Sequence, residues 1–344
     1  MIAVQLVPYE VWMVSPPSVQ TMIAGRISVS ISALMGCGIL CESMSPSDAI
    51  LLMAYGTPAR TADIAPYYTH IRGGREPTPE RLAELTARYD AIGGSSPLFA
   101  ITQETARTLA ARLDIPVYIG MKHWHPYIEE TVTRMHGDGV RRAVAITLAP
   151  HYSRMSVGAY IKAAEAAAAQ AGGPRLRCVE SWHLHPGLIR TLAERVRGSR
   201  GRLEAPEAAH VLFTAHSLPK RIMEWGDPYA VQLVETSKAV AGAAGVARWS
   251  FAFQSASATG EAWLGPDVLD AIRDLASKGV RNVIVCPVGF VADHLEVLYD
   301  LDVEAKGLAE SLGLRLARTE SLNASPPFIE TLTAIAQDAL QSAA

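Results

Sequence analysis

Residues that can do chemistry follow four apolar, strand-like runs of this sequence, at the point where each run ends. Tyr55 follows AILLMA, His151 follows AVAITLAP, and His216 closes the run HVLFTAH. The fourth run, NVIVCP, leads into VGFVADHLEVLYDLDVE (288–304), which contains five acidic residues and one histidine. Imidazole nitrogen and carboxylate oxygen together suit a divalent first-row metal. Imidazole also accepts a proton near neutral pH. The pattern therefore predicts a site that handles metal cations and protons.

The acidic stretch has a regular spacing. Glu296, Asp300 and Glu304 are four residues apart, so in an α-helix they would lie on one face, roughly 6 Å apart. At an effective dielectric of about 20, each neighbouring pair would cost about 3 kcal/mol. A solvated helix face could carry such charges, but this ladder follows an apolar strand directly, which favours a role in holding cations. His216 and Glu296 are the candidate reaction pair, Asp300 and Glu304 lie on the approach, and His294 is expected to be structural.

Two other interpretations of His216 remain open from the residues alone. A lone histidine after a strand is often a hydrogen-bonded core residue. Ser217 beside it suggests a hydrolase, but the local sequence TAHSLP lacks the G-x-S-x-G nucleophile elbow.

Composition narrows the class of protein. The chain has 344 residues, is 49% hydrophobic and carries a formal net charge of −3, which is enough for one large or two ordinary domains. No basic tract indicates nucleic acid, and no block of like charge indicates a disordered tail. Four cysteines in a chain of this length do not make a disulfide framework. A cytoplasmic protein is the default expectation.

The first 45 residues differ from the remainder. They contain one arginine and no lysine, and their apolar runs are interrupted by SPPS and by Gly25-Arg26. No run reaches the ~20 residues that span a bilayer, and no basic segment precedes an apolar core as in a signal peptide. The preferred interpretation is a start assigned too early, with Met44 as the natural start. The alternative is a genuine, poorly ordered extension.

Eight strand-like runs alternate with helix-length segments, several of which end in glycine. The runs are AILLMAY (49–55), PVYIG (116–120), AVAITLA (143–149), RLRCVE (175–180), HVLFTA (210–215), WSFAFQ (249–254), NVIVCP (282–287) and LRLART (314–319). This alternation predicts an α/β fold with doubly wound parallel sheets. The runs divide into two sets of four with matching ends, such as LLMAYGTP and VLFTAHSLP. We therefore predict residues 46–185 plus 324–344 as a first α/β domain, 186–323 as a second, and a ligand cleft beyond the carboxyl ends of the strands.

At these strand ends the chain resembles the ferrochelatases, and in particular the coproporphyrin ferrochelatases of Gram-positive bacteria. The resemblance runs from about Asp48 to the C-terminus. It rests on the ordered blocks LLMAYGTP, YYTHIRGGREPTPERL, RYDAIGGSSPL, YIGMKHWHPYIEE, LAPHYSRMSVGAY, AHSLP, GDPY, WLGPD and PVGFVADHLEVLYDLD. It implies a chelatase-like fold of two similar Rossmann-like halves, each with a four-stranded parallel sheet. The implied activity is that of a lyase inserting Fe²⁺ into coproporphyrin III to give coproheme in haem biosynthesis.

The resemblance also implies residue roles. His216 and Glu296 match the metal-binding and catalytic histidine and glutamate, and Asp300 and Glu304 match an acidic line of metal contacts from the surface. Tyr55 matches the tyrosine on the opposite side of the macrocycle, which ligates iron in the product. The positions that match other porphyrin contacts are Arg72, Arg88, Tyr89, Ser96 and Tyr160, and His123 matches an accessory position.

Expectations about cofactors and partners follow from the same resemblance. No cysteine follows Cys286, so the iron–sulfur cluster that some family members carry on C-terminal cysteines is not expected. Iron arrives as Fe²⁺, so no redox cofactor is needed, and the acidic ladder is a candidate Mg²⁺ site. The expected partners are coproporphyrin III, Fe²⁺ and, transiently, neighbouring haem-pathway enzymes. We expect a monomer with no integral membrane segment and no nucleic-acid partner.

Three alternative functions remain open. They are a protoporphyrin IX ferrochelatase, a cobalt or nickel chelatase of related fold, and a non-catalytic tetrapyrrole carrier. The segment FQSASATG, which precedes EAWLGPD, is less typical of the family than its surroundings. This departure is expected to concern the local loop and not the active site.

Overall fold

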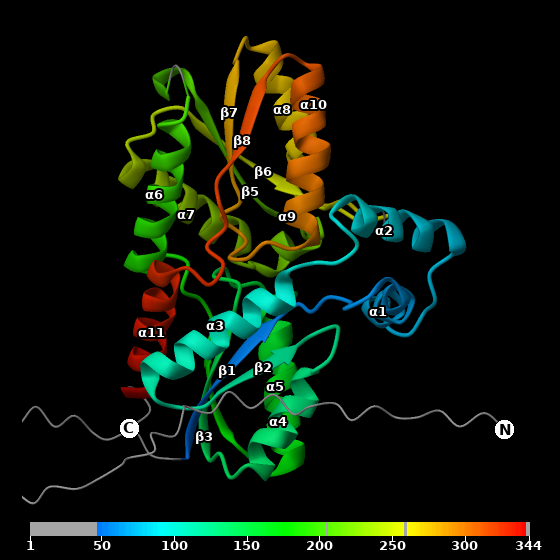
Figure 1. Cartoon of the computed structure of the whole chain (residues 1–344), viewed down its shortest axis with the longest axis vertical. Coiled ribbons are helices and arrows are strands. Elements are labelled where there is room, and N and C mark those ends of the chain that lie inside the picture. Colours follow the sequence, from blue (N-terminus) through cyan, green and yellow to red (C-terminus); the bar gives the residue numbers. More distant parts are fainter. Residues whose placement is uncertain (1–46, 204–205, 258–259, 342–344) are drawn as a thin grey trace, which may run out of the picture.

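The computed structural model describes residues 47–203, 206–257 and 260–341 (Figure 1). The predictions about residues 1–45, whether a start assigned too early or an extension, lie outside the described residues.

Within the described residues, eight parallel strands form two four-stranded sheets. The first sheet contains β1 (Asp48–Ala54), β2 (Val117–Met121), β3 (Arg142–Thr147) and β4 (Arg175–Val179); the second contains β5 (His210–His216), β6 (Trp249–Gln254), β7 (Asn282–Cys286) and β8 (Arg315–Arg318). Each apolar run predicted as a strand is a strand, with its ends within two residues of the prediction.

The two sheets have the same strand order. It is β2-β1-β3-β4 in the first and β6-β5-β7-β8 in the second, with every neighbouring pair parallel. The predicted α/β fold of two similar halves is therefore confirmed. The order places β1 and β3, and likewise β5 and β7, at the centres of their sheets. In open parallel sheets, ligands usually bind beyond the carboxyl ends of the strands at the point where the strand order reverses. Here that point lies at the central strands.

Helices cover both faces of each sheet (Figure 1). In the first half they are α1 (Ile64–Ile71), α2 (Pro79–Ala91), α3 (Leu98–Leu113), α4 (Ile128–Gly137) and α5 (Val157–Ala171). Those that follow are α6 (Pro186–Arg200), α7 (Tyr229–Ala244), α8 (Val268–Ser277), α9 (Leu295–Tyr299), α10 (Lys306–Ser311) and α11 (Pro326–Gln341). Short 3₁₀ turns lie at Thr61–Asp63, Pro206–Ala208 and Lys220–Trp225, and a π-helix spans Asp300–Ala305.

One hydrophobic core joins the two halves. It runs from Ile50 of β1 to Ile284 of β7 and includes Leu332 of α11. Helix α11 packs against the first half, where it contacts α3 and β3, and it also contacts α6. The ring centroids of Trp182 and Phe328 lie 6.1 Å apart in this contact. The domain bounds proposed from the sequence remain a prediction.

Helix α2 crosses from the first half to the second. It leaves the body of the first half together with α1 and contacts α9 (Figure 1). Thr78 caps its N-terminus, where the hydroxyl accepts a 3.5 Å hydrogen bond from the backbone N–H of Arg81. Because α9 carries Glu296, this contact places α2 beside the candidate site.

Candidate active site

His216 and Glu296 are brought together by a close approach of two backbones. Gly289, in the loop that follows β7, lies against the end of β5. A Cβ atom at this position would be 2.4 Å from the Cβ of Ala215 and 2.9 Å from its Cα. The N–H of Gly289 donates to the carbonyl of Thr214 at 3.2 Å. Only glycine allows this approach, which delivers α9 to the carboxyl end of β5.

The two side chains form an ion pair. Nε2 of His216 lies 3.5 Å from Oε1 of Glu296, and both side chains are about 30% exposed, at 29% and 30%. Nδ1 of His216 is hydrogen-bonded to the carbonyl of Ser217. Tyr229 donates to the carbonyl of His216 at 2.9 Å, which fixes the end of the strand.

The pair has strongly shifted protonation equilibria. Burial alone would lower the pKa of His216, but the charge and hydrogen bond of Glu296 and the Ser217 carbonyl raise it to about 9. Burial would raise the pKa of Glu296, yet His216, and then His294, hold it well below its usual range. At neutral pH the resting pair is therefore imidazolium and carboxylate.

His294 supports the glutamate from the other side. Its Nδ1 contacts the carbonyl of Ala292 at 2.9 Å, and its Nε2 lies 3.5 Å from Oε2 of Glu296. The carboxylate therefore sits between two imidazoles. The prediction that His294 is structural accords with this position, although its contact with Glu296 was not foreseen.

The acidic ladder does not continue as one α-helix. Helix α9 ends at Tyr299, and the π-helix begins at Asp300. The wider π turn moves the following side chains off the face that an α-helix would give them. The α-helical spacing assumed from the sequence is therefore wrong beyond Tyr299. π-Helical turns of this kind occur often at functional sites.

Asp300 is the buried acid of the ladder, with a side chain only 7% exposed. It accepts a hydrogen bond from Ser255 and forms an ion pair with Arg88. Burial is the main cause that raises its pKa to about 6; the charges of Glu296 and Glu304 add to the rise, while Ser255 and Arg88 oppose it. The charges of Glu296 and Glu304 therefore both reach Asp300, which lies between them in the sequence.

Two further acids of the stretch are neutralised by a single arginine. Arg318, at the end of β8, donates two hydrogen bonds to Asp302, at 2.9 and 2.8 Å, and lies 3.1 Å from Asp293. Asp293 also accepts hydrogen bonds from Ser321 and Asn323. These residues hold both ends of the segment that carries Glu296 and Asp300, which explains how five nearby acids are tolerated.

Three tyrosines of the first half have raised pKa values to which the Glu296 charge contributes. Burial, and next the Glu296 charge, raise the pKa of Tyr55 above its usual range. Burial also raises the pKa of Tyr160, followed by the influence of Tyr55 and then of Glu296. Burial also raises the pKa of Tyr89 to about 12, and Glu296 contributes to that rise. Tyr89 lies 3.2 Å from the hydroxyl of Thr57 in the Tyr55 loop. Three of the predicted macrocycle contacts are thus within electrostatic reach of Glu296.

Gly56 shapes the loop that presents Tyr55. Its φ of +94° is in the left-handed region, and an added Cβ would lie 2.9 Å from the backbone nitrogen of Trp124. Glycine is therefore required beside the tyrosine. His123 packs against Tyr55, with ring centroids 4.6 Å apart. Burial, followed by the charges of Lys122 and His70, lowers the pKa of His123 to about 3, so this imidazole is neutral at neutral pH.

Two predicted macrocycle contacts have only local partners in this structure. Arg72 donates from Nε to the carbonyl of Arg75 at 3.2 Å and lies over the ring of Tyr68. The Ser96 hydroxyl accepts a 3.3 Å hydrogen bond from the N–H of Leu98 at the start of α3. Their roles toward a macrocycle remain predictions.

Other residues of the site were missed by sequence reasoning. Gln254, at the end of β6, donates to the carbonyl of Glu296 at 2.9 Å, and Ser255 beside it holds Asp300. Both belong to FQSASATG, the segment that looked least typical. The signal that could have found them was their position: they follow β6, the parallel neighbour of β5, where Gln254 pairs with His216.

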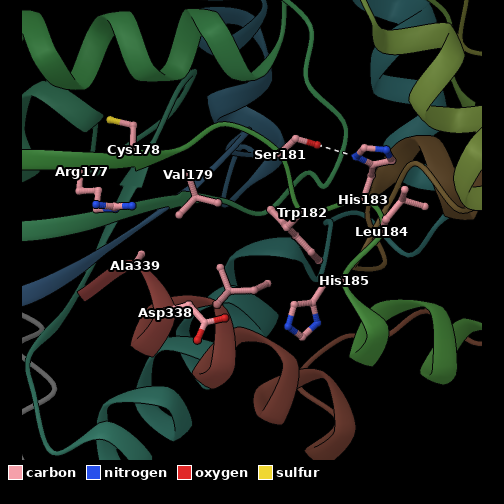
Figure 2. Close-up of a pocket in the computed structure, with 11 residues that line it drawn as sticks. Arg177, Cys178, Val179, Ser181, Trp182, His183, Leu184, His185, Asp338 and Ala339 are labelled. Atoms are coloured by element: carbon pink, nitrogen blue, oxygen red, sulfur yellow. Dashed lines mark hydrogen bonds between the residues drawn. The ribbon is translucent and has the colours of Figure 1, made fainter. Parts of the chain in front are cut away.

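Two cavities lie outside this cluster. One, of about 470 Å³, is at the end of β4, where α11 provides Asp338 and where Ser181 is hydrogen-bonded to His183 (Figure 2). The other, of about 790 Å³, lies between α1 and the loop before α4 and is lined by His70, Trp124 and Tyr127, among others. Neither lining contains His216 or Glu296.

Within residues 47–203, 206–257 and 260–341, no three His, Cys, Asp or Glu side chains are arranged as a ready metal site. The candidate metal contacts instead lie in series along α9 and the π-helix. Over the same ranges, no helix combines the length and the apolar character of a membrane span.

The fold is that of the chelatases. SirB from Bacillus subtilis with Fe³⁺ has a TM-score of 0.54 at 10% identity, covering 85% of this chain and 95% of that one. The sirohydrochlorin chelatase SirB from Bacillus subtilis subspecies spizizenii in complex with cobalt has a TM-score of 0.51 at 11% identity, covering 86% and 96%. At such identities the likeness concerns the fold alone.

Sequence similarity identifies the family. The ferrochelatase family model matches residues 47–340. The coproporphyrin III ferrochelatase of Geobacillus kaustophilus (strain HTA426) is 47% identical over 296 residues, which cover 83% of this chain and 94% of the relative. That of Bacillus subtilis (strain 168) is 45% identical, covering 83% and 96%. The ferrochelatase of Herpetosiphon aurantiacus is 42% identical, covering 85% and 99%. The chain belongs to the ferrochelatase family.

Proposed function

We propose that this chain inserts Fe²⁺ into coproporphyrin III, giving iron coproporphyrin III (coproheme) and releasing the two pyrrole protons. Its support is the family and the names of its relatives. The observation that carries the proposal is the pair of His216 and Glu296, whose Nε2 and Oε1 atoms are 3.5 Å apart, with the buried carboxylate of Asp300 four residues further on.

The reaction has two obstacles. Two N–H protons must leave the macrocycle, and the hydrated metal must lose its water. A planar ring hides its nitrogen lone pairs, so a site that holds the ring bent would expose them at the expense of binding energy.

His216 and Glu296 supply a proton acceptor and a metal contact on one side. Because the resting imidazole carries a proton at neutral pH, that proton must leave before His216 can bind a metal or accept a pyrrole proton. Fe²⁺ near Glu296 favours the loss of the His216 proton, because the metal replaces the imidazolium as the cation that the carboxylate attracts. Asp300 and Glu304 offer exchangeable oxygens along the approach.

The first half supplies the macrocycle contacts. Tyr55 is the proposed tyrosine on the opposite face, and Tyr89 and Tyr160 lie beside it. Coproporphyrin has four propionates, for which Arg72 and Arg88 are the proposed partners. Ser96 and His123 complete the proposed set, the latter in an accessory role.

The remaining expectations are part of the same proposal. Iron is ferrous in both substrate and product, so the reaction needs no redox cofactor. The absence of an iron–sulfur cluster, a Mg²⁺ ion near the ladder, a monomeric state, a cytoplasmic location and transient contacts with haem-pathway enzymes remain predictions.

Anaerobic Fe²⁺ insertion into coproporphyrin III and protoporphyrin IX tests the proposal, with Co²⁺ and Ni²⁺ as competing metals. We expect iron insertion to be fastest with coproporphyrin III and to be abolished by His216→Ala, while porphyrin binding persists. Faster insertion into protoporphyrin IX would favour the protoporphyrin alternative. Preference for cobalt or nickel would indicate the related chelatases, and binding without insertion by the wild type would indicate a carrier.

A further inference from the structure

Asp300 is held by residues from both halves of the protein. Ser255, which follows β6, donates its hydroxyl to the carboxylate. Arg88 comes from α2 of the first half, and its NH1 lies 3.7 Å from Oδ1 of Asp300. The proposed metal approach is therefore in contact with a cation that the other half supplies.

The two arginines that face the acidic stretch are bound in different ways. Arg318 is 13% exposed and grips Asp302 through two hydrogen bonds of 2.9 and 2.8 Å. Arg88 is 33% exposed, and its contact with Asp300, at 3.7 Å, is longer than an ordinary hydrogen bond. Arg318 therefore forms a fixed ion pair with Asp302. The ion pair between Arg88 and Asp300 is looser, and Arg88 can exchange Asp300 for another carboxylate.

Arg88 has other contacts that would keep it in place during such an exchange. Its guanidinium donates to Glu84, one helical turn earlier, at 3.1 Å. It also lies 5.0 Å from the ring centroid of Tyr299, the residue before Asp300. The planar fork can therefore turn from one carboxylate to another without leaving the ring on which it is stacked.

We propose that Arg88 stays paired with the carboxylate of Asp300 until a carboxylate of the bound macrocycle becomes the partner of Arg88 instead. Macrocycle binding thereby frees Asp300 and opens the acidic approach to Fe²⁺. The inference rests on the proposed function, which supplies the macrocycle carboxylates. A guanidinium beside Asp300 repels an arriving dication and competes for its oxygens. A propionate that accepts the same N–H donors removes this competition.

The mechanism predicts a coupling between two ligands. Macrocycle binding tightens metal binding, and by linkage the metal tightens macrocycle binding by the same factor. Displacing one partly exposed charge from the vicinity of Asp300 corresponds to about a tenfold change in metal affinity. Glu296 and Glu304, whose charges act on Asp300, and Glu84, which pairs with Arg88, are present in both states.

The test uses Mn²⁺ in place of Fe²⁺, followed by the electron paramagnetic resonance signal of the free ion. Zinc coproporphyrin III, whose centre is already filled, occupies the macrocycle site without turnover. For the wild type we expect saturating zinc coproporphyrin III to tighten Mn²⁺ binding about tenfold. For Arg88→Met we expect tight Mn²⁺ binding with or without the macrocycle. Asp300→Asn should bind Mn²⁺ weakly in both states.

The matched control is Arg273→Met, which breaks an exposed pair with Asp270 on α8 and should keep the wild-type coupling. Arg88→Lys retains the charge and serves as a second variant if Arg88→Met does not fold. It should keep part of the coupling. Undiminished coupling in Arg88→Met, or no coupling in a wild type that inserts iron, would overturn the inference. A wild type that inserts no iron would instead refute the proposed function.

Discussion

Arg318→Gln is expected to damage both the stability and the iron chemistry of this protein. The guanidinium bridges Asp293 at 3.1 Å and Asp302 at 2.8 Å, and it is 13% exposed. Breaking a buried ion pair on one side typically costs about 3–5 kcal/mol. Asp302 is 38% exposed, and Asp293 keeps its bonds to Ser321 and Asn323. Because water and these bonds offset part of the loss, we expect a decrease of about 2 kcal/mol in the free energy of unfolding.

For a chain of this size, that loss corresponds to a melting temperature lower by about 3 °C. Activity should fall more steeply, because Glu296 and Asp300 lie between the two acids that Arg318 holds. A displacement of about 1 Å at a reacting group can cost about 100-fold. We therefore expect kcat/KM for Fe²⁺ to fall by about 10- to 100-fold, while the KM for coproporphyrin III changes little. Thermal melts and insertion assays at limiting iron measure the two effects.

A double-mutant cycle distinguishes loss of the ion pair between Arg318 and Asp302 from non-specific destabilisation of the fold. Asp302→Asn in the Arg318→Gln background removes a carboxylate that has lost its partner, so part of the melting temperature should return. Arg273→Gln, which breaks an exposed pair on α8, should cost under about 1 kcal/mol. The reasoning is refuted if Arg318→Gln melts and inserts iron like the wild type, or if the second substitution restores nothing.

Three more predictions concern the same segment. The pKa of His216 is raised to about 9, so this residue stabilises the fold fully below its unfolded pKa near 6.5 and loses the contribution as pH rises through 9. In Glu296→Gln, an NMR titration should place the pKa of His216 below 6.5, because burial is then the dominant influence. An unchanged pKa would contradict the ion pair. Asp300, with a pKa raised to about 6, opposes folding increasingly as pH rises from about 4 through 6. Asp300→Asn should therefore raise the melting temperature at pH 8 and not at pH 4, while lowering the insertion rate; equal melting shifts at both pH values would count against the burial argument. In Gly289→Ala the new Cβ would be 2.4 Å from that of Ala215. This substitution should lower the free energy of unfolding by more than about 2 kcal/mol and separate His216 from Glu296. Denaturant unfolding and the insertion rate measure the two effects, and wild-type values in both would disprove the close approach.

The strands were predictable because their signal is local. β1 is buried along its whole length, so its sequence is a continuous apolar run, as expected for a strand covered on both faces. The C-terminal return was predictable for the same reason, since Phe328, Leu332 and Ile335 follow a helical period. His216 and the ladder acids could be proposed because chemistry-bearing residues cluster where parallel strands end.

The partners of those acids could not be predicted, because each contact joins distant parts of the chain. Ser255 and Asp300 are 45 residues apart, and Arg318 reaches back 16 residues to Asp302. The residues themselves are common loop residues with no pattern of their own. The π-helix was also missed, since a four-residue spacing fits an α-helix and nothing local marks the wider turn.

The position of α11 has a consequence for how the chain folds during synthesis. All four strands of the first sheet are complete once Val179 has been made, but α11, from Pro326 to Gln341, is made only after all four strands of the second sheet. Until then the apolar surface around Trp182 and α3 lacks the side chains of Phe328 and Leu332. The first half is therefore expected to remain incompletely packed while the second half is made, and to gain its final stability only after α11 has been made.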